Sequence, residues 1–233
     1  MMNISNFEYI FIIILGFVVP FALTITISIK NKLIKLEYYL YCYFLFILFF
    51  LIFAKLLYCI ANFQLNEKIQ LLISPDISSK LSFVLSGYSF IGGYIGGLFG
   101  VIIFLKLIKH YQNEIILLFT LNLLLMYSIL KIGCFLKGCC YSTYLPIPIQ
   151  LIESFISFLS FTFILYLNKK KYTTSFLICL GLLLFALIRF ITAFFRYFST
   201  NFGFILNQVI CIFLILLSMY LLYKSSKHTN FIH

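Results

Sequence analysis

Five polar residues lie within or beside long apolar stretches of this chain, and their types suit the binding of an anion. Arg189, Lys131 and Lys55 are cations, Glu153 is a carboxylate, and Gln150 is an amide. An ionisable side chain at membrane depth costs about 2.5–3.5 kcal/mol on insertion scales unless it is paired or hydrated, so such residues mark functional sites by default. Gln150 and Glu153 are three residues apart, which places both on one face of a helix.

Arginine at this depth can do what lysine cannot. A guanidinium is a planar fork that pairs two phosphate oxygens, whereas an ammonium is a point charge. Arg189 and Arg196 are seven residues apart, so on one helix they would share a face, and with Glu153 they predict a cationic pocket with one carboxylate. Two alternatives stay open: a simple interhelical ion pair between Arg189 and Glu153, and snorkelling of Lys55 and Lys131 to the membrane interface.

These residues are positioned by seven apolar runs. Of the 233 residues, 64% are hydrophobic and 10% charged, whereas ordinary soluble domains carry about 25% charged residues. A membrane span needs about 20 apolar residues, and in lipid its backbone must be hydrogen bonded within the segment, so each run predicts a helix. The expected fold class is an all-α polytopic membrane protein, one transmembrane domain over residues 1–233. Its seven predicted spans are 7–29, 39–60, 84–107, 115–132, 151–167, 173–195 and 204–223.

The distribution of basic residues predicts an N-out/C-in orientation. The inside loops would then hold Lys30, Lys32, Lys35, Lys106, Lys109, Lys169, Lys170, Lys171, Lys224 and Lys227, and the outside loops Lys68, Lys80, Lys137 and Arg196. This pattern accounts for the net charge of +11, so we expect no nucleic-acid partner. The first residues carry Glu8 and no cation, which indicates a retained span rather than a cleaved signal peptide. In this orientation the five polar residues share one level in the outer half of the bilayer.

The third run contains five closely spaced glycines. Gly92, Gly96 and Gly100 recur every four residues, with Gly93 and Gly97 beside them. Small residues at this spacing let a neighbouring helix approach closely, which is the predicted role. Exposure of backbone amides to a lipid headgroup is the alternative.

The segment between the fourth and fifth spans contains three cysteines. Cys134, Cys139 and Cys140 lack the spacing and the nearby histidine of a structural zinc site, so we expect no metal. A disulfide from Cys134 to Cys139 or Cys140 and three inert thiols are the two open alternatives. Gly133 and Gly138 in the same segment predict non-helical turns.

In their order and spacing these motifs resemble the prolipoprotein diacylglyceryl transferases, seven-helix enzymes of the bacterial inner membrane. The matching segments are Tyr9-x6-Gly16, Ala54-Lys55-Leu56-Leu57-Tyr58, Gly92-Gly93-x-Ile95-Gly96, Lys131-Ile132-Gly133-Cys134-Phe135 with Gly138, Pro148-x-Gln150-Leu151-x-Glu153-Ser154, and Arg189-Phe190 with Arg196. The chain departs from the family pattern at several positions. Ile91 stands for His, Lys131 for Arg, Cys134 for Asn, Cys139 for Glu, Ser142 for Gly and Ala193 for Glu.

The resemblance implies transfer of a diacylglyceryl group from phosphatidylglycerol to the thiol of a lipobox cysteine, with prolipoprotein peptide and membrane lipid as partners and no cofactor. It implies catalytic roles for Glu153, Arg189 and Tyr9. The substrate-binding residues would be Lys131, Gln150, Arg196, Gly92, Gly93 and Lys55. The implied location is the bacterial cytoplasmic membrane. The alternative is a non-catalytic paralogue that binds lipid or lipopeptide in the same cleft.

Overall fold

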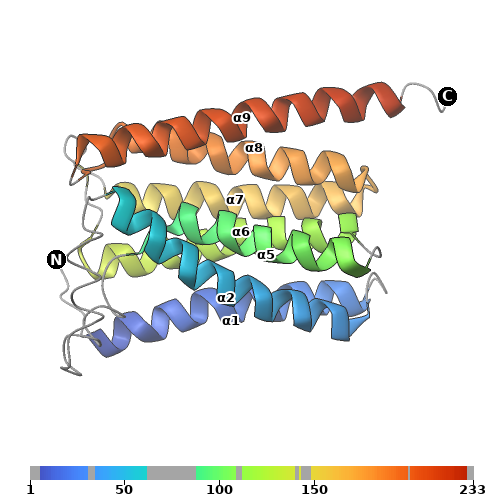
Figure 1. Ribbon diagram of the computed structural model, residues 1–233, viewed down its shortest axis with the longest axis horizontal. Coiled ribbons are helices and arrows are strands. Elements are labelled where there is room, and N and C mark those ends of the chain that lie inside the picture. The colour runs from blue at the N-terminus through green and yellow to red at the C-terminus, as the bar shows by residue number, and fades with distance from the viewer. Residues whose placement is uncertain are drawn as a thin grey trace. The chain divides into compact units, whose positions relative to one another are not determined.

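The computed structural model describes residues 6–30, 35–61, 88–108, 112–139, 142, 148–198 and 200–229. Its helices are α1 (Asn6–Lys30), α2 (Leu36–Ala61), α5 (Phe90–Ile108), α6 (Gln112–Leu136), α7 (Ile149–Lys169), α8 (Thr174–Ala193) and α9 (Asn201–Thr229) (Figure 1). Within these residues seven helices are long and apolar enough to cross a membrane. The predicted all-α, seven-span architecture is confirmed, and the chain is a multi-pass membrane protein.

Three helix boundaries differ from the sequence prediction in ways that affect the polar residues. Helix α5 begins at Phe90, later than the predicted start at residue 84, and Tyr88 and Ser89 precede it in a non-helical conformation. Helix α6 continues to Leu136, so Lys131 lies inside it rather than at its end. Helix α8 ends at Ala193, so Arg196 does not share its face with Arg189 as predicted.

The two glycines near the end of α6 have different roles. Gly133 is helical, contrary to the prediction of a turn, because it lies against α1: a Cβ atom there would be 2.8 Å from Cγ2 of Ile12. Gly138 has a φ of 72°, a conformation that glycine adopts without strain, and it lies in the turn that follows the helix. Close helix packing therefore decides the first position and turn geometry the second.

The helices divide into two compact units. The first contains α1, α6, α7, α8 and the part of α9 from Asn207 onward, and α6 packs against α1, α7 and α8 within it. Helices α6 and α7 run in opposite directions, as the contacts between Tyr127 and Glu153 and between Leu124 and Ser157 show (Figure 1). Helix α8 runs parallel to α6, since Gly181 lies against Thr120 and Arg189 against Tyr127. The carboxyl ends of α6 and α8 therefore meet the amino end of α7.

Small polar side chains join α6 to α7 along this contact. The hydroxyls of Ser128 and Ser154 are 3.1 Å apart, and Ser157 donates a hydrogen bond to the carbonyl of Leu124 at 2.7 Å. Serine permits close backbone approach and supplies interhelical hydrogen bonds, both of which favour helix association in lipid. This pairing fixes the register that brings the charged residues of the two helices together.

The second unit contains α2, α5 and residues 199–206. The glycines of α5 face phenylalanines and other apolar residues of α2, including Phe46 opposite Gly97 and Phe49 opposite Gly100. This confirms their predicted packing role. Thr200 adds a hydrogen bond of 2.8 Å from its hydroxyl to the carbonyl of Ala61.

The glycine packing leads to the first testable prediction. A Cβ atom at Gly92 would lie 2.5 Å from Cβ of Leu57 and 2.8 Å from the carbonyl oxygen of Phe53. We expect Gly92→Ala to lower the free energy of unfolding by about 1–3 kcal/mol, because a backbone carbonyl cannot move aside cheaply. The unfolding midpoint of the purified protein in detergent measures this. Ile95→Ala, on an exposed part of the same helix, is the control, and equal midpoints for Gly92→Ala and the wild type would contradict the prediction.

Candidate functional site

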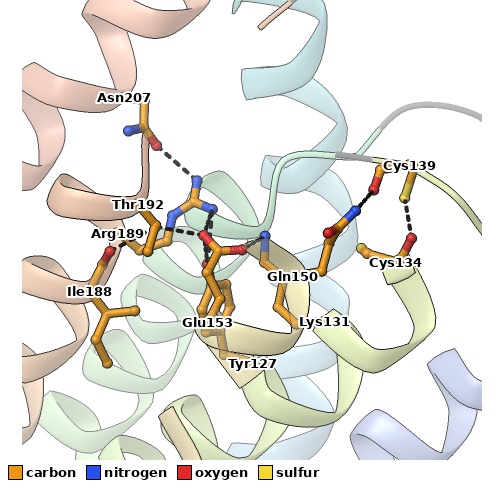
Figure 2. A network of polar contacts seen from close by, with 10 residues as sticks. All are labelled: Tyr127, Lys131, Cys134, Cys139, Gln150, Glu153, Ile188, Arg189, Thr192 and Asn207. Atoms are coloured by element: carbon orange, nitrogen blue, oxygen red, sulfur yellow. Dashed lines mark hydrogen bonds and ion pairs between the residues drawn. The ribbon is translucent and has the colours of Figure 1, made fainter. Parts of the chain in front are cut away.

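A buried carboxylate forms the centre of a polar network in the first unit. Glu153 of α7 has no solvent exposure, and its Oε1 accepts hydrogen bonds from the hydroxyls of Tyr127 at 2.9 Å and Thr192 at 2.7 Å (Figure 2). Its Oε2 forms an ion pair with Nζ of Lys131. Both oxygens of this carboxylate are therefore engaged.

Helical spacing places these partners around Glu153. Tyr127 and Lys131 are four residues apart on α6, and Arg189 and Thr192 are three apart on α8, so each pair shares one helix face. The packing of α6 and of α8 against α7 brings both faces to Glu153, near the amino end of α7. Three helices thus contribute to one buried cluster, which Figure 2 shows from close by.

Arg189 of α8 contacts residues of three other helices. Its Nη1 donates a hydrogen bond to the hydroxyl of Tyr127 at 3.1 Å and is 3.9 Å from Oε1 of Glu153. Its Nη2 donates to Oδ1 of Asn207 on α9 at 2.8 Å. The direct neighbours of the guanidinium are therefore a phenol and an amide, both neutral, and the carboxylate lies at the outer limit of an ion pair.

Lys131 does not snorkel to the membrane interface. Its side chain is almost fully buried, and its ammonium is 5.1 Å from the centroid of the Tyr127 ring. The Cζ of Arg189 is 5.6 Å from the same centroid, and the ring packs edge-on against Phe185. Tyr127 therefore contacts both cations with its ring and bridges Arg189 to Glu153 with its hydroxyl.

The network carries an excess of positive charge. Lys131 and Arg189 are two cations against the single carboxylate of Glu153. Arg196 lies beyond the end of α8, within electrostatic reach of Glu153, and its backbone pairs with that of Ser142. Charges buried in low dielectric cost several kcal/mol each unless they are compensated, so the unmatched positive charge favours an anion at this site.

Gln150, one helical turn before Glu153 on α7, binds the segment that follows α6. The side chain is buried, and its Nε2 donates a hydrogen bond to the carbonyl of Cys139 at 2.7 Å. The thiol of Cys139 in turn donates to the carbonyl of Cys134 at 3.5 Å. Cys134 and Cys139 are not joined by a disulfide in this structure. Cys140 lies outside the described residues, so its predicted bridge stays a prediction.

Tyr9 contacts a different part of the same unit. Its ring lies 3.9 Å from Nζ of Lys137 and against Gly133, at the contact between α1 and α6. These contacts place the ring against the end of α6 and the turn that follows it. Its predicted catalytic role stays a prediction.

The other predicted binding residues belong to the second unit. Nζ of Lys55 lies 4.8 Å from the ring centroid of Tyr88, and the amide of Ser89 donates to the carbonyl of Ala54 at 2.9 Å. Burial raises the pKa of Tyr88 above its ordinary value, so Lys55 faces a neutral ring at physiological pH. Gly92 and Gly93 pack on α2. For Lys55 and these two glycines, substrate binding stays a prediction.

Sequence reasoning missed three members of the network: Tyr127, Thr192 and Asn207. Each is uncharged, and uncharged polar residues in an apolar run are too common to mark a site. A usable signal was their spacing from the charged residues, since Tyr127 lies four positions before Lys131 and Thr192 three after Arg189. For Asn207 the signal was the adjacent amide of Gln208 inside the last apolar run.

Comparison with known proteins gives one match that covers nearly the whole chain. The family model described as prolipoprotein diacylglyceryl transferase matches residues 2–224. No curated protein matches the chain. The matched range includes every residue of the network around Glu153.

Proposed function

Because the chain belongs to the prolipoprotein diacylglyceryl transferase family, we propose that it moves a diacylglyceryl group from phosphatidylglycerol to the thiol of a lipobox cysteine. The cysteine sulfur attacks the glyceryl carbon and a carbon–sulfur bond forms. The carbon–oxygen bond to the phosphate breaks and glycerol phosphate leaves as an anion. The observation that supports this proposal is the buried, net positive network around Glu153, because the reaction needs cations that hold a phosphodiester and stabilise its leaving charge.

In this mechanism Arg189 holds the phosphate and Glu153 orients the cations. The guanidinium binds neutral partners directly, so its charge remains available to a phosphate. Glu153 is already bound by Tyr127, Thr192 and Lys131, which suits an orienting carboxylate better than a proton acceptor. The thiol proton, from a group with an ordinary pKa of about 8.5, then passes to a base other than Glu153.

Both carboxylate oxygens of Glu153 are already bound by neighbouring side chains, and this favours a second candidate function. A paralogue that binds lipid or lipopeptide without turnover needs the anion site but no base. One experiment separates the two candidates: the purified protein is mixed with phosphatidylglycerol labelled in its acyl chains and with a lipobox peptide. A labelled peptide resistant to thioester cleavage supports the transferase. Binding of the lipid with no labelled peptide supports the binder.

We further propose the bacterial cytoplasmic membrane as the location, with the N-terminus outside and the C-terminus inside. The excess of lysine in the loops assigned to the inside supports this orientation. In a background where Cys134, Cys139 and Cys140 are serine, a cysteine at position 170 is expected to stay unlabelled by an impermeant reagent in intact cells. A cysteine at position 137 is expected to react. Labelling at 170 with protection at 137 would reverse the orientation.

A further inference from the structure

Asn207 binds the guanidinium that the proposed mechanism assigns to the phosphate. The residue lies on α9, and its Oδ1 accepts a hydrogen bond of 2.8 Å from Nη2 of Arg189. Figure 2 shows it reaching the guanidinium from the side opposite to Tyr127. Both side chains are more than nine-tenths buried, Asn207 being 7% exposed and Arg189 8%. The contact thus fixes one edge of the guanidinium inside the protein.

The same two side chains hold buried donors that the described residues do not satisfy. Nδ2 of Asn207 and Nε of Arg189 have no hydrogen-bond partner among them. A buried donor without a partner costs roughly 1–3 kcal/mol, so native structures seldom retain two at one contact without a ligand. Both atoms donate only, and therefore the missing partner is an acceptor.

The charge of the site identifies the kind of acceptor. The direct partners of Arg189, the phenol of Tyr127 and the amide of Asn207, are neutral. Ala193, one turn further along α8, supplies no carboxylate. The nearest carboxylate to this guanidinium, Glu153, is 3.9 Å away and is also paired with Lys131. An acceptor that meets the guanidinium and the neighbouring amide is therefore favoured when it carries negative charge and more than one oxygen.

We propose that Asn207 is a substrate-binding residue that orients Arg189 through Oδ1 and donates from Nδ2 to a phosphate oxygen of the ligand. The proposal rests on the proposed function for the source of that phosphate, the headgroup of a phospholipid. It assigns Asn207 two tasks that chemistry can separate, because only the first needs an acceptor and only the second needs a donor.

Asn207→Asp separates these tasks. Aspartate has the same size and still accepts from Arg189, but it has no Nδ2 donor and adds a negative charge beside the phosphate. If Asn207 lay away from the ligand and only held Arg189 in place, neither the lost donor nor the added charge would reach the phosphate, and ligand binding would be largely preserved. Under the proposal it weakens binding at least about tenfold, as expected for the loss of a hydrogen bond to a charged group.

The test measures ligand binding by the rise in unfolding midpoint of the full-length protein in detergent, which does not depend on turnover. The probes are dihexanoyl phosphatidylglycerol, uncharged dihexanoylglycerol and inorganic phosphate. We expect the phospholipid to stabilise the wild type, the uncharged lipid to have no such effect, and Asn207→Asp to abolish the stabilisation. Ser218→Ala, at another buried polar residue of α9, is the control and is expected to respond like the wild type.

The outcomes of this test and of the transfer assay are distinguishable. Loss of the phospholipid effect in Asn207→Asp supports the proposal even if the wild type transfers nothing, in which case only turnover is refuted. A response to inorganic phosphate that depends equally on Asn207 supports the contact and makes free phosphate its source. Full stabilisation of Asn207→Asp by the phospholipid overturns the proposal, whether or not transfer occurs, and so does a wild type that none of the phosphate probes stabilises.

Discussion

Glu153→Gln is expected to lower the free energy of unfolding by about 3–5 kcal/mol, because it leaves buried cations without their carboxylate. Lys131 loses its ion partner, and Arg189 loses the only carboxylate within 4 Å among the described residues. With its oxygen kept toward the hydroxyls of Tyr127 and Thr192, the amide that replaces the carboxylate turns its NH2 donor toward the ammonium of Lys131. The change in unfolding midpoint in detergent measures this cost, and transfer activity is expected to fall below detection.

A double substitution shows whether Glu153→Gln lowers stability through unbalanced charge or through disturbed packing. Lys131→Met removes the cation that Glu153 neutralises, so Lys131→Met with Glu153→Gln is expected to recover most of the lost stability. Activity is not expected to return, since the network then lacks the carboxylate that orients Arg189. Phe155→Ala, at an exposed residue of α7 close to Glu153, is the control for general effects of substitution in this helix. A Glu153→Gln protein as stable as the wild type would show that the ion pairs do not hold the cluster.

The sequence predicted the charged part of this cluster for an energetic reason. Burying a charge in lipid is expensive, so Arg189, Glu153 and Lys131 could each be identified from their positions in apolar runs. The depth argument then placed them at one level, and the structure brings all three together. The helical form of the seven spans could be predicted for a related reason. Backbone N–H and C=O groups that are not hydrogen bonded are also costly in lipid.

The remaining features depend on packing, which a single sequence does not display. Glycine is typical of turns, which is why the sequence predicts a turn at Gly133. The residue lies within α6 instead, where the absence of a Cβ atom lets α1 approach closely. The seven-residue spacing predicts that Arg196 shares the helix face of Arg189, but α8 ends at Ala193. Asn207 and Tyr127 carry no charge, and their importance appears only when α9 and α6 are seen beside Arg189.

Arg189→Lys is expected to reduce kcat/KM for transfer by about 100-fold, the usual effect of removing one preorganised donor to a developing anion. Lysine retains the positive charge, so the fall in kcat/KM measures the contribution of the planar shape of the guanidinium. The guanidinium uses separate nitrogens for Tyr127 and Asn207 and still has Nε to offer, whereas one ammonium cannot reach both partners and hold two phosphate oxygens. Stability is expected to fall less than in Glu153→Gln, because Glu153 keeps a cation on each side.

The matched control is Arg196→Lys, the same chemical change at the other arginine. Arg196 lies beyond the end of α8, its guanidinium is 5.7 Å from the ring centroid of Phe198, and its charge acts on Glu153. We expect this variant to keep transfer within about threefold of the wild type, since lysine retains the positive charge that Arg196 supplies near Glu153 and the proposed mechanism assigns the phosphate to Arg189. The assay follows initial rates over a range of phosphatidylglycerol concentrations in mixed micelles. Full activity of Arg189→Lys would remove Arg189 as the phosphate ligand, and an equal loss in both variants would show that the fork geometry of Arg189 has no special role.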